Sequence, residues 1–250
     1  IIQHPDVRLN LSNMKACVEA VRALLYGTVY YGDLARVTTE ETQKSECEDM
    51  IQILTPMCKG WATEVALDIT RTAIQVFGGV GYTKDFPVEQ LYRDLQISTI
   101  YEGTTGIQAL DLVGRKLTMR NGELLMNLLK HFQDVIEEQK NHPDLGTTIQ
   151  LWEKSCEHVG EVAMEIQSLM QDRGLEGAVL YATPYLMFLS GVTAGYFLIQ
   201  QGVVASEKLK NLKETQHIDE SQKERFTKDH SEEQFYDNKI KIARFYVYAV

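Results

Sequence analysis

The sequence is poor in cysteine, and its histidines do not cluster. Its four cysteines, Cys17, Cys47, Cys58 and Cys156, are spread along the chain without a C-x-x-C pair, and three lie within helical patterns. A free cysteine in such a position packs as a small hydrophobic side chain, so we expect reduced core thiols in a reducing compartment. The six histidines are scattered, so no metal site is expected.

Three further absences narrow the class of protein. No apolar run approaches the length of a membrane span, and residues 1–5 lack the basic region and cleavage site of a signal peptide. The 25 Lys and Arg against 35 Asp and Glu give a net charge of −10, which speaks against nucleic-acid binding. We therefore expect a cytoplasmic protein without a membrane span, and a sequence that begins within a longer polypeptide.

Apolar residues recur at helical spacing through most of the chain, and no segment is rich in strand patterns. A stripe with alternating spacings of three and four predicts one long helix over 5–36. A second pattern predicts a helix over 45–77, whose expected buried face consists of Ala62, Val65, Ala66, Ile69, Ala73 and Val76. Pro56 lies inside this pattern, so we expect a kink or a restarted helix nearby, and glycines 78 and 79 should end it.

Shorter helical patterns cover 88–95 and 105–117, and with the first two they predict an antiparallel four-helix bundle. Arg120-Asn121-Gly122 breaks the pattern and marks the predicted boundary between a bundle domain, residues 1–119, and an additional helical domain, residues 120–250. The predicted fold class is all-α.

The additional domain is expected to contain helices at 124–140, 148–171, 175–206 and 235–250. Trp152 lies in one of these helices and Trp61 in the second helix of the bundle, and both are expected to be packing residues. The stretch 207–233 is rich in Lys, Glu, Gln and Asp, so we expect a solvated loop or a weakly ordered helix there.

The tract Tyr101-Glu102-Gly103-Thr104-Thr105-Gly106 places one carboxylate just ahead of a predicted helix. Such a residue often only complements the positive helix end, with Thr104 or Thr105 as N-cap, and short motifs frequently mislead. A general base that removes a carbon-bound proton instead needs a carboxylate in an apolar pocket from which water is excluded. Gly103 would let a ligand approach the backbone, and the apolar side chains available for the pocket are Ile97, Ile100, Tyr101 and Ile107.

The turn Gln75–Tyr82 has three glycines in four positions. A glycine pair after a helix is usually only a C-cap, but such a turn also exposes backbone amides that can bind a pyrophosphate. It is not a dinucleotide-binding fingerprint, because no strand precedes it. In the next helix, Arg93 and Asp94 are expected to form a buried ion pair, and a direct ligand contact by Arg93 is the alternative.

In combination, these tracts resemble the C-terminal domain of the acyl-CoA dehydrogenases. The resemblance is nearly continuous over 61–117, and it rests on QVFGGVGY at 75–82, PVEQLYRD at 87–94 and IYEGT at 100–104. The variant EGTTGIQALDL at 102–112 narrows it to the larger bacterial branch that includes the 3-methylmercaptopropionyl-CoA dehydrogenases. That branch carries an extra helical domain after the catalytic one, which would account for residues 121–250.

The resemblance implies an enzyme that oxidises an acyl-CoA thioester to a trans-2-enoyl-CoA. Glu102 would be the base that takes the α-proton, while the β-hydride passes to N5 of FAD. Tyr101 and Gly103 match positions that line the acyl-CoA site, and Thr104 matches a position near the flavin, as does Gly106. The adenine-diphosphate end of FAD, usually that of a neighbouring subunit, would be held by Gln75, Val76, Phe77, Gly78 and Gly79. Electrons would leave through an electron-transfer flavoprotein.

Several departures from the family pattern matter. Gly106 stands where the family often has Gln, so a flavin contact there is either lost or made by the backbone, and Pro5 replaces a Gln that is common near the start of the long helix. The family's N-terminal helical domain and middle β-domain have no counterpart in this sequence, so we expect the isolated chain to be inactive. We also expect an apolar bundle face where the β-domain would dock, and a homo-oligomer, either dimer or tetramer, through exposed helix faces.

Two other readings of the sequence stay open. An acyl-CoA oxidase would share the base and the flavin but pass electrons to oxygen. A helical assembly module without catalysis is the alternative from a different class, and the retained Glu102 argues against it.

Overall fold

The computed structural model describes residues 1–215 and 231–249. All regular secondary structure in these residues is helical, which confirms the predicted all-α fold class. The α-helices are α1 (Pro5–Val37), α2 (Glu41–Lys59), α3 (Trp61–Phe77), α4 (Val88–Gln96), α5 (Thr105–Asp111), α6 (Glu123–Gln139), α7 (Gly146–Thr215) and α9 (Ser231–Ala249). Short 3-10 turns η1 (Gly78–Tyr82), η2 (Ile97–Thr99) and η4 (Met119–Gly122) and a π-helical turn η3 (Leu112–Lys116) connect some of them.

The second predicted helix is divided into α2 and α3. Pro56 lies in the last turn of α2, and the N–H of Gly60 donates to the Pro56 carbonyl at 2.8 Å, which closes the helix. A new helix starts at once with Trp61. The expected restart after the proline is therefore confirmed.

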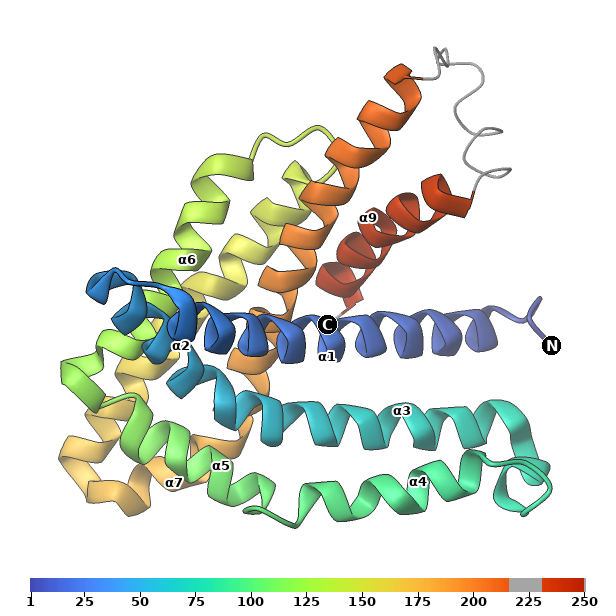
Figure 1. Cartoon of the computed structure of the whole chain (residues 1–250). Coiled ribbons are helices and arrows are strands. Elements are labelled where there is room, and N and C mark those ends of the chain that lie inside the picture. Colours follow the sequence, from blue (N-terminus) through green and yellow to red (C-terminus); the bar gives the residue numbers. More distant parts are fainter. Residues whose placement is uncertain (216–230, 250) are drawn as a thin grey trace.

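The long helix α1 lies in the middle of the molecule (Figure 1). On one side α3 runs antiparallel to α1, and α4 returns beside α3. On the other side α7 crosses α1, α9 ends close to it, and both contact it. Because α1 contacts α2, α3, α7 and α9, one helix joins the predicted bundle to the C-terminal helices.

The element α7 consists of two helices that meet at Gly174. This residue has φ 71° and ψ −174°, outside the helical region, and the chain reverses there (Figure 1). The second part reaches Thr215, and α9 starts at Ser231, so of the two possibilities left open for 207–233, a loop or a helix, residues 207–215 and 231–233 form helices. Leu209 and Glu233 are buried, so packing holds these polar stretches in helices; residues 216–230 of that prediction lie outside the described residues.

One continuous hydrophobic core runs through both halves of the chain. At its centre the rings of Phe132, Trp152 and Tyr196 lie against one another, with centroids 5.1 Å apart for the first pair and 6.3 Å for the second. The Trp152 ring N–H donates to the Val192 carbonyl at 3.0 Å. Both Trp61 and Trp152 are buried, which confirms their predicted packing role.

The distal half of α3 leaves this core. Ala62 is buried as expected, but the rest of the predicted buried face is only half-buried: Val65, Ala66, Ile69, Ala73 and Val76. In this part α3 is flanked by α1 and α4 (Figure 1). The face is therefore only partly covered by the described residues.

The break at residues 120–122 is built from left-handed backbone. Arg120, Asn121 and Gly122 have φ values of 48°, 58° and 91°. The Arg120 guanidinium binds the carboxylate of Asp49, which is buried on α2, and Asn127 Nδ2 donates to the same carboxylate at 3.0 Å. Burial raises the pKa of Asp49 in spite of Arg120. The predicted break is confirmed, and the division into two domains at this point stays a prediction.

Within Gly146–Glu214 one stretch is long and apolar enough to cross a membrane, with a mean hydropathy of 1.3. Of that stretch, 72% is buried inside the structure, as in the core helix of a globular fold. Its apolar side chains are thus accounted for by packing. Among residues 1–215 and 231–249, no three His, Cys, Asp or Glu side chains are placed to hold a metal ion.

Candidate functional site

Glu102 lies in the short loop between η2 and α5. Its backbone is left-handed, with φ 55°, and the following Gly103 has φ 92°. Gln108 on α5 reaches back and donates from Nε2 to the Glu102 carbonyl at 3.2 Å. Thr104 is the N-cap of α5, since its Oγ1 accepts the N–H of Ile107 at 3.4 Å. A non-glycine residue in this conformation is uncommon and often marks a functional site.

The side chain of Glu102 is exposed. Its expected apolar neighbours surround the loop, but each is itself more than half exposed: Ile97, Ile100, Tyr101 and Ile107. The predicted pocket from which water is excluded is therefore not formed by the described residues. The reason is that the loop lies on the outer side of the bundle, at the end of α4 (Figure 1).

Two side chains from distant parts of the sequence, Lys59 and Glu64, hold the loop. Lys59 Nζ donates to the Ser98 carbonyl at 2.7 Å and lies 5.6 Å from the centroid of the Tyr101 ring. Thr105 Oγ1 donates to Glu64 Oε1 at 2.6 Å, which ties the start of α5 to α3. The sequence analysis missed both contacts, because their partners are 39 and 41 residues apart. They fix the backbone that presents Glu102.

The glycine turn begins where α3 ends. The Gly78 N–H donates to the Gln75 carbonyl, and Gly78 has φ 69° and ψ −150°, a conformation that is essentially restricted to glycine. A Cβ added to Gly78 or Gly79 would meet no atom within 4 Å, whereas one on Gly81 would lie 2.6 Å from Cβ of Phe77. Gly78 and Gly79 are thus open to a ligand, and Gly81 is fixed by packing within the turn.

The glycine turn and the Glu102 loop lie at opposite ends of α4 (Figure 1). Val88–Gln96 has 9 residues, which as an α-helix span about 13 Å. The structure therefore brings together Tyr101, Glu102, Gly103, Thr104 and Gly106 in one place. The other group, Gln75–Gly79, is held apart from them within a single chain.

The buried ion pair expected on α4 is wrong. The Arg93 side chain is 64% exposed, and its guanidinium lies 3.6 Å from the carboxylate of Glu89, one turn earlier on the helix. Asp94 is also exposed. Neighbouring residues on a helix point to different sides, so Arg93 pairs at the i, i+4 spacing instead.

Two family models match almost the whole chain. The model for the acyl-CoA dehydrogenase C-terminal domain matches residues 1–117, and a model described as acetyl-CoA dehydrogenase C-terminal like matches residues 128–250. The chain belongs to the acyl-CoA dehydrogenase family. It corresponds to the C-terminal part of these proteins.

Curated relatives support this assignment along the full length of the chain. A butyryl-CoA dehydrogenase of Syntrophomonas wolfei is 31% identical over 247 residues, covering 99% of this chain and 38% of the relative. A 3-methylmercaptopropionyl-CoA dehydrogenase of Ruegeria pomeroyi is 33% identical over 213 residues, covering 84% of this chain and 35% of the relative. This acyl-CoA dehydrogenase chain thus spans little more than a third of the length of these relatives.

Solved structures share the fold. Caenorhabditis elegans ACDH-11, solved in complex with C11-CoA, has a TM-score of 0.64 at 21% identity and matches 97% of this chain and 36% of its own. An acyl-CoA dehydrogenase from Bacillus anthracis, solved with FAD, has a TM-score of 0.61 at 18% identity and matches 100% and 41%. At these identities the likeness shows a shared helical architecture.

Proposed function

We propose that this chain is the C-terminal helical part of an FAD-dependent acyl-CoA dehydrogenase, in which Glu102 is the catalytic base. The reaction is the α,β-dehydrogenation of an acyl-CoA thioester to a trans-2-enoyl-CoA. The observation that carries the proposal is the Glu102 loop, where a carboxylate on left-handed backbone is held by contacts from α2, α3 and α5. The match of residues 1–117 to the family model includes this loop.

In this mechanism Glu102 takes the α-proton of the bound thioester on its carboxylate. Its proton affinity must rise for this role, which requires that water be excluded around it. The exposed rings and chains of Tyr101, Ile97, Ile100 and Ile107 supply the apolar half of such a pocket. We propose that the other half of the pocket is supplied by parts of the complete protein that correspond to the regions of the relatives which this chain does not cover. The chain by itself would therefore be inactive.

The residues of the glycine turn fit an extended anionic cofactor. Gly78 and Gly79 leave open space, and backbone N–H groups in such a turn can bind phosphate. FAD, when bound, accepts the β-hydride of the substrate. Its adenine-diphosphate end would be held by Gln75, Val76, Phe77, Gly78 and Gly79. Thr104 and the backbone of Gly106 would lie near the flavin, and Tyr101 and Gly103 near the acyl-CoA.

The separation of the two groups by α4 favours an assembly of several copies. In the resembling family the glycine turn holds the adenine-diphosphate end of the FAD of a neighbouring subunit, and in this chain the turn and the Glu102 loop lie at opposite ends of α4. We therefore propose a homo-oligomer, dimer or tetramer, in which the glycine turn of one copy serves the flavin of another. Exposed apolar side chains at the turn, including Phe77, Val80 and Tyr82, provide surface for such contacts. An electron-transfer flavoprotein is the proposed acceptor, and the cytoplasm the proposed location.

The test is Glu102→Gln in the complete protein, with Glu123→Gln, an exposed glutamate at the start of α6, as the matched control. Glutamine keeps the shape of the side chain but cannot accept the proton. We expect unchanged flavin absorbance and a dehydrogenation rate lower by about 100-fold or more, the usual range for loss of a general base. The control should keep both the flavin and the rate.

Two results would contradict the proposal. If the complete wild-type protein showed no flavin absorbance, the remaining candidate function would be that of a helical assembly module. Full activity of Glu102→Gln would remove Glu102 as the base. Reduction of oxygen at the same rate as of an electron-transfer flavoprotein would instead favour an acyl-CoA oxidase.

A further inference from the structure

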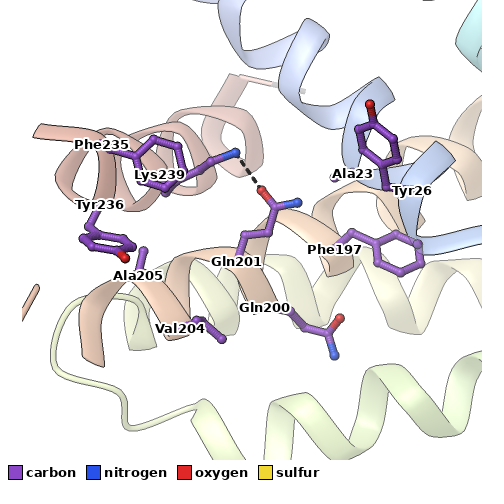
Figure 2. Close-up of a pocket in the computed structure, with 11 residues that line it drawn as sticks. Ala23, Tyr26, Phe197, Gln200, Gln201, Val204, Ala205, Phe235, Tyr236 and Lys239 are labelled. Carbon is purple, nitrogen blue, oxygen red and sulfur yellow. Dashed lines mark hydrogen bonds between the residues drawn. The ribbon is translucent and has the colours of Figure 1, made fainter. Parts of the chain in front are cut away.

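A groove lies between α1, α7 and α9, outside the Glu102 loop (Figure 2). Its volume is about 700 Å³, within the usual range for small-molecule sites. Its walls are mainly apolar and aromatic, and they include Ala23, Tyr26, Phe197, Val204, Phe235 and Tyr236. The lining residues all belong to α1, α7 and α9, so the groove is separate from the elements that carry Glu102 and the glycine turn.

The apolar part of the groove is elongated. Phe197 and Val204 stand 7 positions apart on α7, which corresponds to about 10 Å along the helix. Phe197 is buried and forms the floor at one end, while Val204 and Phe235 are more than half exposed along the rim. A strip of this length suits an extended alkyl chain, because each methylene can lose contact with water along it.

A cluster of positive charge borders the groove. Lys239 Nζ donates to Gln201 Oε1 at 3.0 Å inside the groove and to Glu19 Oε2 at 2.7 Å behind it. Glu19 also lies 2.7 Å from Lys15 and 3.8 Å from Arg22. Three cations around one carboxylate leave a formal charge of +2 (3 − 1 = 2), on a chain whose net charge is −10.

Lys239 lies in the middle of the groove. Its Nζ is 5.6 Å from the centroid of the Phe235 ring, and its partner Gln201 stands between Phe197 and Val204 on α7 (Figure 2). A negative group of a ligand would therefore lie at Lys239, and its apolar part would extend from there along the apolar wall. An ammonium has three donors, and Lys239 uses two of them toward described residues.

We propose that this groove binds an alkyl carboxylate. The carboxylate lies at Lys239, and the alkyl chain lies along the apolar wall formed by Phe197, Val204 and Phe235. Burial of the chain supplies the affinity, and the positive charge at Lys239 selects a carboxylate over an uncharged head group.

The test measures binding of dodecanoate to the purified 250-residue chain by calorimetry below the concentration at which dodecanoate aggregates, with dodecanol as the uncharged analogue. Val204→Glu places a carboxylate on the rim at an exposed position, so the fold should tolerate it. Val179→Glu is the matched control, because it is the same change on the same helix at a partly exposed position outside the groove. Circular dichroism verifies that all variants are folded.

We expect dodecanoate to bind wild type and Val179→Glu equally, and Val204→Glu at least tenfold more weakly. Lys239→Gln should weaken dodecanoate several-fold and leave dodecanol unchanged, which a merely structural role of Lys239 would not produce. The proposal is overturned by any of three results: no binding of dodecanoate, equal affinity of wild type for dodecanoate and dodecanol, or equal loss in the Val204 and Val179 variants.

Discussion

Replacement of Gly27 by alanine should destabilise the protein, because α1 and α7 meet there without room for a methyl group. A Cβ built on Gly27 would lie 2.4 Å from Cε1 and 2.7 Å from Cζ of Phe197. Phe197 is buried, and its ring lies 5.0 Å from that of Tyr196, so it cannot move toward Tyr196 without disturbing the aromatic core. This contact is one of those that join α1 to the C-terminal helices.

The magnitude follows from two opposing effects. Overpacking a core by one methyl group costs about 1–3 kcal/mol of unfolding free energy. Replacing glycine by alanine inside a helix contributes about 0.5–1 kcal/mol in the other direction. The net expectation for Gly27→Ala is a loss of about 0–2.5 kcal/mol, against a gain at Gly32. Gly32→Ala, in the same helix, would meet no atom within 4 Å and should gain about 0.5–1 kcal/mol.

Urea unfolding of the purified chain, followed by far-ultraviolet circular dichroism, measures both changes. In a Phe197→Leu background the smaller side chain should remove the clash, so Gly27→Ala should no longer be destabilising there. The double-mutant cycle then gives the interaction energy of the pair. Equal stabilisation by Gly27→Ala and Gly32→Ala in the wild-type background would refute the close packing of α1 on α7.

Two further predictions concern the glycine turn and the aromatic core. Gly78→Ala should lower the free energy of unfolding by about 1–3 kcal/mol, because the backbone conformation of Gly78 is strained for any residue with a Cβ. Gly79→Ala should change stability little, since a Cβ there meets no atom within 4 Å. Thermal unfolding measures both, and equal effects of the two substitutions would contradict the turn geometry. Burial lowers the pKa of His131, so below the unfolded pKa of about 6.5 the unfolded chain binds a proton that the folded chain does not. Stability should therefore fall by up to about 1.4 kcal/mol per pH unit as the pH drops below that value, and more gently in His131→Gln. Parallel pH profiles for the two proteins would contradict this assignment.

Much of the fold follows from local pattern. Helical spacing predicted the long first helix, and the structure has it at Pro5–Val37. Pro56 and Gly60 divide the next pattern into two helices. Both act on the neighbouring turn alone, since Pro56 lies in the last turn of α2 and Gly60 ends it. The left-handed residues at 120–122 and the reversal at Gly174 coincide with predicted breaks for the same reason.

The predictions that failed concerned what a helix packs against or pairs with. The expected burial of the distal face of α3 fails since few described residues cover it. Arg93 pairs with Glu89, four positions earlier, because Asp94 points elsewhere on the helix. The polar stretch after residue 206, for which the sequence left a loop or a weak helix open, stays helical because Leu209 packs into the core.

Some features of the candidate site also follow from local sequence, and others depend on tertiary structure. The sequence by itself determined the carboxylate, the glycines and the helix cap of the Glu102 loop, because turns and caps are set by residues a few positions apart. Only the tertiary structure decided that Lys59 and Glu64 hold this loop, that α4 separates it from the glycine turn, and that α1, α7 and α9 enclose a groove. These features need segments that are far apart in the chain to pack together, and no local pattern encodes which segments meet.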